Sequence, residues 1–191
     1  MQFSSDTRSV EMTGEVYFEV VHNAEKPFIV RLPSTLALHG AGANRQPISI
    51  EDLGTSFNIR SYVDDSITTA TLVEGSVRIS RNGQQVTLTP GQQSVAANNN
   101  DEIRVVQHAN MNEALAWKNG IFYFQNARLP DVMKQLTEWY QADVVYKGKP
   151  SGKLFSGQID KSLSLAYVLE GLEQPGVKFN LDGHQITVTQ E

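Results

Sequence analysis

The chain has 191 residues, of which 40% are hydrophobic, so it is long enough to fold as one large domain or two small ones. Its formal net charge is −5 and it has no run of lysine and arginine, which argues against binding to DNA or RNA. It contains no cysteine, which excludes disulfides, thiolate zinc sites and thiol catalysis.

The N-terminal half has the pattern of many short β-strands. Val16, Phe18 and Val20 alternate with polar or aromatic neighbours, which is the period-two pattern of a half-buried strand. The alternation recurs at residues 28–32 and 77–80. Residues 37–46 lack this pattern, and we expect them to form a loop.

Asn82-Gly83 gives the clearest local prediction, a β-hairpin between residues 77–79 and 86–88, because both residue types tolerate the positive φ angles of a tight turn. Turns recur about every ten residues, a spacing typical of a sandwich, barrel or β-solenoid. We therefore predict an all-β domain over residues 1–111, β-solenoid or sandwich-like, with short antiparallel strands.

The pattern changes after Gly120. Residues 121–125 suit a strand, and Leu129-Pro130-Asp131 suits the start of a helix, since proline fits the first helical position and a carboxylate favours the first turn. The predicted apolar face of this helix contains the following residues at helical spacing: Val132, Met133, Leu136, Trp139 and Tyr140.

A second copy of this arrangement follows. Strands are predicted at residues 143–146 and 153–159, and Ser164 is expected to cap a helix whose apolar face includes Leu165 and Leu172. A final hairpin is predicted across Asp182-Gly183. The repeat predicts a small α+β domain over residues 112–191, with two β-α-β units and two helices on a sheet.

Residue patterns for catalysis or metal binding are missing. The four histidines, His22, His39, His108 and His184, lack the spacing of a metal site. The neighbouring carboxylates of Glu51-Asp52 and of Asp64-Asp65 would point to opposite faces of a strand, whereas a glycosidase needs two facing carboxylates. We therefore expect no catalytic, metal or cofactor site.

Five stretches, in this order, resemble the FecR domain: Gly14-Glu15-Val16-Tyr17-Phe18-Glu19-Val20, Pro27-Phe28-Ile29-Val30, Leu53-Gly54-Thr55-Ser56-Phe57-Asn58-Ile59, Leu72-Val73-Glu74-Gly75-Ser76-Val77 and Leu88-Thr89-Pro90-Gly91-Gln92-Gln93. Trp117-Lys118-Asn119-Gly120, Phe124-Gln125-Asn126 and Trp139-Tyr140 resemble the C-terminal domain of Bacteroidetes members. That domain is similar to the short secretin/TonB N-terminal fold. The resemblance covers Arg8 to Val188.

The resemblance implies a role in transmembrane signalling. An outer-membrane TonB-dependent transducer would touch the periplasmic part, and the message would reach an extracytoplasmic-function sigma factor through a cytosolic segment. That segment and a single transmembrane helix lie outside this sequence, since no stretch approaches the roughly 20 apolar residues that span a bilayer and no leader is visible. We therefore expect a piece of a longer, membrane-anchored protein that is not an enzyme.

Two sets of residues follow from this interpretation. The family motifs are expected to define the fold through Gly14, Phe18, Gly54, Phe57, Glu74, Gly75, Pro90, Gly91, Trp117 and Phe124. We expect a sheet edge or helix face of the C-terminal domain to bind the partner, with these candidate residues: Tyr123, Gln125, Gln158, Asp160, Gln185 and Thr187.

Two other functions stay open. A glycosidase would show an acidic cleft with facing carboxylates. A carbohydrate-binding or adhesin module of the cell envelope would show exposed coplanar aromatic rings. Six aromatic residues cluster in the C-terminal half, and at least three have core-facing spacing: Trp117, Phe122, Tyr123, Phe124, Trp139 and Tyr140.

Overall fold

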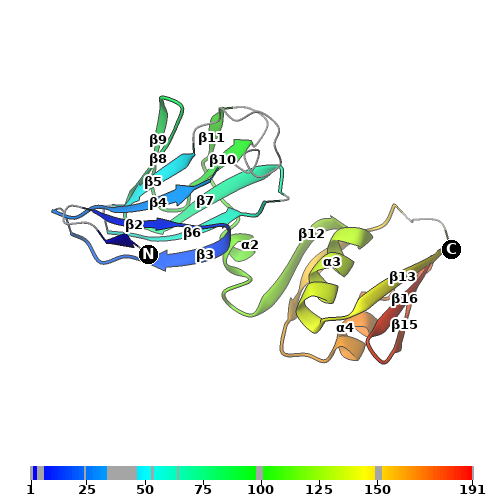
Figure 1. Ribbon diagram of the computed structural model, residues 1–191. Coiled ribbons are helices and arrows are strands. Elements are labelled where there is room, and N and C mark those ends of the chain that lie inside the picture. Colours follow the sequence, from blue (N-terminus) through cyan, green and yellow to red (C-terminus); the bar gives the residue numbers. More distant parts are fainter. Residues whose placement is uncertain are drawn as a thin grey trace. The chain divides into compact units, whose positions relative to one another are not determined.

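The computed structural model describes residues 2–3, 7–23, 25–33, 47–52, 54–63, 65–97, 101–148 and 152–190 (Figure 1). The chain divides into two compact units, Met1–Ala114 and Leu115–Glu191. The expected loop at residues 37–46, His39 and Asp64 lie outside the described residues. Among the described helices, none combines the length and apolar character that crossing a membrane requires.

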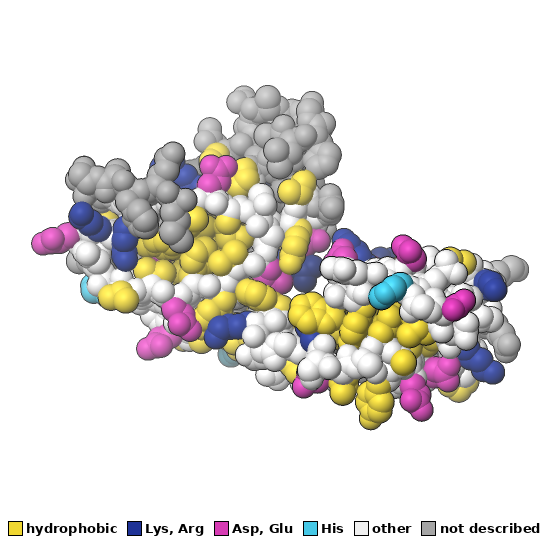
Figure 2. All heavy atoms as spheres, turned by 60° about the horizontal axis from the view of Figure 1, so that its bottom comes forward, with side chains coloured by type: hydrophobic (Ala, Val, Ile, Leu, Met, Phe, Trp, Pro, Cys, Tyr) yellow, Lys and Arg dark blue, Asp and Glu magenta, His cyan; other side chains and the backbone are white. Residues whose placement is uncertain are grey.

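The two units differ in charge. Residues 1–114 contain 8 basic and 13 acidic residues, whereas residues 115–191 contain 8 of each, so the net charge of −5 belongs to the first unit. Figure 2 shows basic side chains scattered singly among acidic and polar ones on the visible face of each unit. Neither unit presents on that face the basic field that a polyanion would need.

The N-terminal unit consists of two sheets of short strands. The six-stranded sheet has the order β1 (Gln2–Phe3), β2 (Arg8–Glu11), β4 (Phe28–Leu32), β5 (Ile48–Asp52), β8 (Val77–Arg81), β9 (Gln84–Leu88). The five-stranded sheet has the order β11 (Ile103–Val106), β10 (Gln93–Ala97), β7 (Ile67–Glu74), β6 (Ser56–Ser61), β3 (Gly14–Glu19). Neighbouring strands are antiparallel except β2 and β4.

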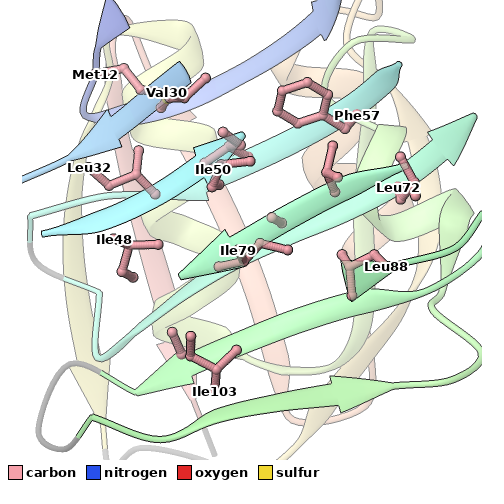
Figure 3. Close-up of a cluster of buried hydrophobic side chains, with 14 of the residues drawn as sticks. Met12, Val30, Leu32, Ile48, Ile50, Phe57, Leu72, Ile79, Leu88 and Ile103 are labelled. Atoms are coloured by element: carbon pink, nitrogen blue, oxygen red, sulfur yellow. The ribbon is translucent and has the colours of Figure 1, made fainter. Parts of the chain in front are cut away.

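Both sheets contribute to one hydrophobic core, which makes the unit a sandwich. Val30 and Ile50 of the first sheet and Leu72 of the second are fully buried (Figure 3). Phe18 stacks on Phe57 with a ring-centroid distance of 5.2 Å. The predicted all-β class is confirmed, and of its two forms the sandwich is observed.

The predicted hairpin joins β8 and β9. Arg81 pairs with Gln84 across Asn82 and Gly83, whose φ angles are 48° and 83°. Both values lie in the left-handed region that this turn requires. The hairpin is confirmed because its signal is entirely local.

Two glycines of the family motifs lie in tightly packed turns, Gly75 against the Gly54 loop and Gly54 against His22. Gly54 and Gly75 have φ angles of +101° and +88°. A Cβ atom on Gly75 would lie 2.5 Å from the carbonyl oxygen of Gly54 and 2.5 Å from Cγ2 of Thr55. A Cβ on Gly54 would lie 2.5 Å from Cβ of His22. These positions therefore require glycine for space as well as for conformation.

The C-terminal unit contains the two predicted β-α-β repeats. Its elements are the end of α2 (Met111–Leu115), then β12 (Ile121–Arg128), α3 (Leu129–Tyr140), β13 (Asp143–Gly148), β14 (Leu154–Asp160), α4 (Leu165–Leu172), β15 (Val177–Asp182) and β16 (Gln185–Gln190). Pro130 lies in the first turn of α3, and the Ser164 hydroxyl accepts a hydrogen bond from the Tyr167 N–H at 3.4 Å. The α+β class is confirmed.

The strands of this unit form two sheets, where a single sheet was expected. β12 pairs with β14, and β13, β16 and β15 form a separate sheet in that order. The helices lie between the sheets (Figure 1), and one core joins all these elements. Val132 and Met133 of α3 are both fully buried although they point about 100° apart, so the helix needs cover from more than one side.

Trp139 departs from the predicted apolar face of α3. It is 54% exposed, whereas Leu136 one turn earlier is fully buried. Its indole N–H donates to the carbonyl of Lys161 at 3.1 Å, and the Lys161 ammonium lies 4.8 Å from its ring centroid. Helical spacing gives the direction of a side chain but not whether a neighbouring element covers that turn.

We expect Trp139→Ala to lower the free energy of unfolding by about 1–2 kcal/mol, since it removes one hydrogen bond and one cation–π contact. Phe122→Ala, which empties a buried site, should cost about 3–5 kcal/mol. Urea unfolding of both variants measures the difference. Equal costs would mean that Trp139 is a core residue after all.

Replacing Gly75 by alanine should destabilise the N-terminal unit by about 2–3 kcal/mol more than replacing Gly83 does, because only Gly75 faces a steric clash. Gly83 is the matched control: its φ is +83°, and a Cβ there meets nothing within 4 Å. Chemical denaturation of the two variants checks this expectation. Similar losses would show that conformation alone determines the requirement for glycine.

Candidate functional site

Four of the six candidate partner-binding residues lie together on the outer face of the β12–β14 sheet. Tyr123 and Gln125 come from β12, and Gln158 and Asp160 from β14; Tyr123 stands directly opposite Gln158. The Tyr123 hydroxyl donates to the Gln125 side-chain oxygen at 3.5 Å. The alternate residues of β12, such as Phe122, point into the core, so this face is the one available for contact.

Gln185 and Thr187 lie elsewhere. Both belong to β16, the middle strand of the other sheet, where Thr187 pairs with Val145 of β13. The six residues therefore do not form a single surface. Strand alternation predicts which face a residue occupies, but it cannot predict which sheet the strand joins.

A groove follows the edge of β14 that is turned away from β12. Its volume is about 200 Å³, and it is lined by Phe124, Phe155, Ser156, Gly157, Gln158, Ile159, Gly171, Leu172 and Gln174. Successive side chains of a strand point to opposite faces of its sheet. Because consecutive residues of β14 line the groove, the groove lies along the backbone edge of the strand. Within the described residues β12 is the only strand paired with β14, so this edge has backbone donors and acceptors available for another strand.

Two glycines keep the groove open. A Cβ atom added to Gly157 on β14 or to Gly171 on α4 would meet nothing within 4 Å. Gly171 was not among the predicted site residues. The sequence feature that could have identified it is the glycine itself. Glycine lowers helix stability, and it is not part of the apolar face of α4.

The candidates for catalysis have structural roles. Asp52 is 1% exposed, and its Oδ1 accepts hydrogen bonds from the Gly54 N–H at 2.9 Å and from the Thr55 hydroxyl. Its neighbour Glu51 pairs with Arg78 on the surface at 3.1 Å. Outside the masked segments no group of three or more His, Cys, Asp or Glu side chains has a geometry that could hold a metal.

The clustered aromatic residues do not form an exposed flat platform. Phe122 and Phe124 are buried, and they stack with a centroid distance of 6.2 Å. Trp117, Tyr123 and Tyr140 are partly buried. The Tyr140 hydroxyl donates to the carbonyl of Leu163 at 2.7 Å, and burial raises its pKa. Most of this cluster supports the core and its edges.

Asp160, at the end of β14, accepts a hydrogen bond from the Ser162 N–H at 2.8 Å, which lowers the pKa of its carboxyl group. Because the pKa of Asp160 is lower in the folded protein than in the unfolded chain, its ionised carboxylate stabilises the fold at pH values above the unfolded pKa of about 4. This stabilisation is lost as the pH falls through the folded-state pKa. We expect wild type to exceed Asp160→Asn in stability at neutral pH and to lose that advantage in acid. Unfolding midpoints from neutral to acidic pH measure this, and a constant difference would contradict it.

The comparisons with known proteins cover both units. Residues 121–188 match the family model described as "FecR, C-terminal". Two crystal structures of "a putative anti-sigma factor from Parabacteroides distasonis", at 1.65 Å and 2.50 Å resolution, match 100% of the chain with 26% identity and a TM-score of 0.74. The match covers 84% and 83% of those chains. No curated protein matches the sequence.

The family match lies on the unit that contains the β14 groove. The structural match extends over the β-sandwich as well, in agreement with the order of sequence motifs from Gly14 to Gly91. On these grounds the C-terminal unit matches the FecR C-terminal family, and the whole chain is similar to an anti-sigma factor.

Proposed function

We propose that this chain is the periplasmic, signal-sensing part of a transmembrane anti-sigma regulator. It receives a signal from a TonB-dependent outer-membrane transducer by direct contact and passes it to an extracytoplasmic-function sigma factor. The contact with the sigma factor is made by a cytosolic segment outside this sequence. The chain acts by binding and not by catalysis.

The observation that carries the proposal is the open edge of β14 with the groove beside it. An extended segment of a partner that pairs with β14 satisfies the backbone groups of this edge. Its alternate side chains would then enter the space that Gly157 and Gly171 leave between β14 and α4. Backbone pairing supplies affinity, and the shape of the groove supplies specificity.

The outer face of the same sheet adds polar contacts next to that edge. Gln158 and Asp160 of β14 are exposed, and both stand on the face that also contains Tyr123. Aromatic and amide side chains are common in interfaces because they combine apolar area with hydrogen bonding. A partner strand on β14 would place its own outward residues beside this face.

The anti-sigma role itself rests on the family and on the similarity to the Parabacteroides distasonis protein. A regulator of this kind needs a recognition surface for its partner and does not need a catalytic centre. The buried carboxylate of Asp52, which is engaged in a turn, is consistent with this view.

The test is to measure binding of the chain to the periplasmic signalling domain of a TonB-dependent transducer. Gly171→Phe should fill the groove without disturbing the fold, because a side chain at this position meets open space. We expect it to weaken binding by at least about tenfold, as the loss of one well-packed contact does. Calorimetry measures the affinity.

The control is Ala166→Phe, which adds the same side chain to an exposed position of α4 that does not line the groove. It should bind as wild type does. Gly171→Ala should keep binding and raise the free energy of unfolding by about 0.5–1 kcal/mol. Wild-type affinity for Gly171→Phe would exclude the groove as the contact, and failure of the wild type to bind would overturn the relay itself.

A further inference from the structure

A second cavity lies within the N-terminal unit, on the outer face of its five-stranded sheet. Its volume is about 380 Å³, which is in the range of small-molecule sites. It is lined by Glu15, Asn58, Arg60, Asp65, Ser66, Ile67, Thr69, Thr71, Gln93, Asn110, Glu113 and Ala114. The strands β3, β6, β7 and β10 form its floor, and the segment at the start of α2 contributes to its rim.

Polar side chains on the cavity floor are buried and fixed by one another. Asn58 and Thr71 stand opposite each other on β6 and β7 and are 2% and 1% exposed. The Asn58 amide donates to Glu15 Oε1 at 3.0 Å, and the Gln93 amide donates to the Thr71 hydroxyl at 2.7 Å. An exposed sheet face normally holds mobile polar side chains, whereas these are preorganised.

The charges around the cavity select its ligand. Three carboxylates, those of Glu15, Asp65 and Glu113, stand against one guanidinium, that of Arg60, which pairs with Asp65 at 3.0 Å. The excess of negative charge disfavours phosphates and other anions. Carboxylates and amide oxygens accept hydrogen bonds from ammonium and hydroxyl groups, and the guanidinium and amide N–H groups donate to hydroxyl oxygens.

Two lining residues are apolar, Ile67 and Ala114. Ile67, at the start of β7, is 42% exposed and borders the cavity. A site that combines carboxylates, amides and threonine hydroxyls with a small apolar area suits a small ring that has hydroxyl groups at its edge and C–H groups on its face. A purely apolar ligand would take the carboxylates of the lining out of water without offering them a donor, at a cost in affinity.

We propose that this cavity binds a monosaccharide-sized, hydroxyl-rich ligand that carries an amino group, as an amino sugar does. The site goes beyond the proposed relay function, because it belongs to the other unit and uses none of the β14 groove. Its occupancy would add contacts to the rim formed by Asn110, which precedes α2, and by Glu113 in the first turn of α2, the helix at which the first unit ends.

The experiment titrates the whole chain, observed by ¹H–¹⁵N NMR, with glucosamine, with glucose as a neutral probe and with glucuronate as an anionic one. We expect saturable shifts at Thr69, Thr71 and Gln93 with glucosamine, weaker ones with glucose, and none with glucuronate. Tighter binding of glucuronate than of glucosamine would overturn the proposal. So would the absence of saturable shifts at these residues with every probe at tens of millimolar.

Two variants locate the site. Glu113→Gln should weaken glucosamine by about 3- to 5-fold and leave glucose unchanged, since it removes one of the three carboxylates. Thr69→Val keeps a β-branched residue on β7 and removes one hydroxyl, so it should weaken both sugars by about 5-fold.

The matched controls are Glu25→Gln and Thr87→Val, which make the same changes at exposed positions outside the cavity. Both should bind glucosamine as the wild type does. An equal loss in the controls and the cavity variants would show non-specific charge effects and overturn the site. Transducer binding measured in parallel separates this result from the relay function, because the cavity variants leave the β14 groove intact.

Discussion

The antiparallel pairing of β12 with β14 is the constraint on which the C-terminal unit depends. It joins the first strands of the two β-α-β repeats, and it turns Phe122, Phe124 and Phe155 toward the helices. A two-stranded sheet is only marginally stable alone, so it requires the packing of α3 and α4 against it. Among the residues that the structure describes, no other strand pairs with β14, so this small sheet leaves the second edge of β14 open. That edge is the surface proposed for the partner.

Much of the fold follows from local sequence signals. The Asn82-Gly83 hairpin, the start of α3 at Leu129-Pro130 and the Ser164 cap each depend on residues that are neighbours in the chain. The division of the C-terminal strands into two sheets was not predicted, because β12 and β14 are paired across the intervening α3 and β13. Pairing at that distance is decided by the shared core and leaves no local pattern.

The same distinction applies to the candidate sites. Tyr123 and Gln158 were both expected among the partner-binding residues, and the structure puts them opposite each other on β12 and β14. The cavity of the N-terminal unit could not be predicted, because it brings together residues 15, 58, 71 and 93 from four strands. Gly171 was overlooked for a different reason: a glycine matters there through the space it leaves, which only the three-dimensional structure shows.

The unequal charge of the two units gives their surfaces different kinds of selectivity. The C-terminal unit has no net charge, so long-range attraction contributes little to recognition at β14, and backbone pairing and shape must supply the affinity. The N-terminal unit carries the entire net charge of −5, and its cavity concentrates three carboxylates around one guanidinium. This difference in charge agrees with the two proposals, an extended protein segment at the α+β unit and a small cationic ligand at the β-sandwich.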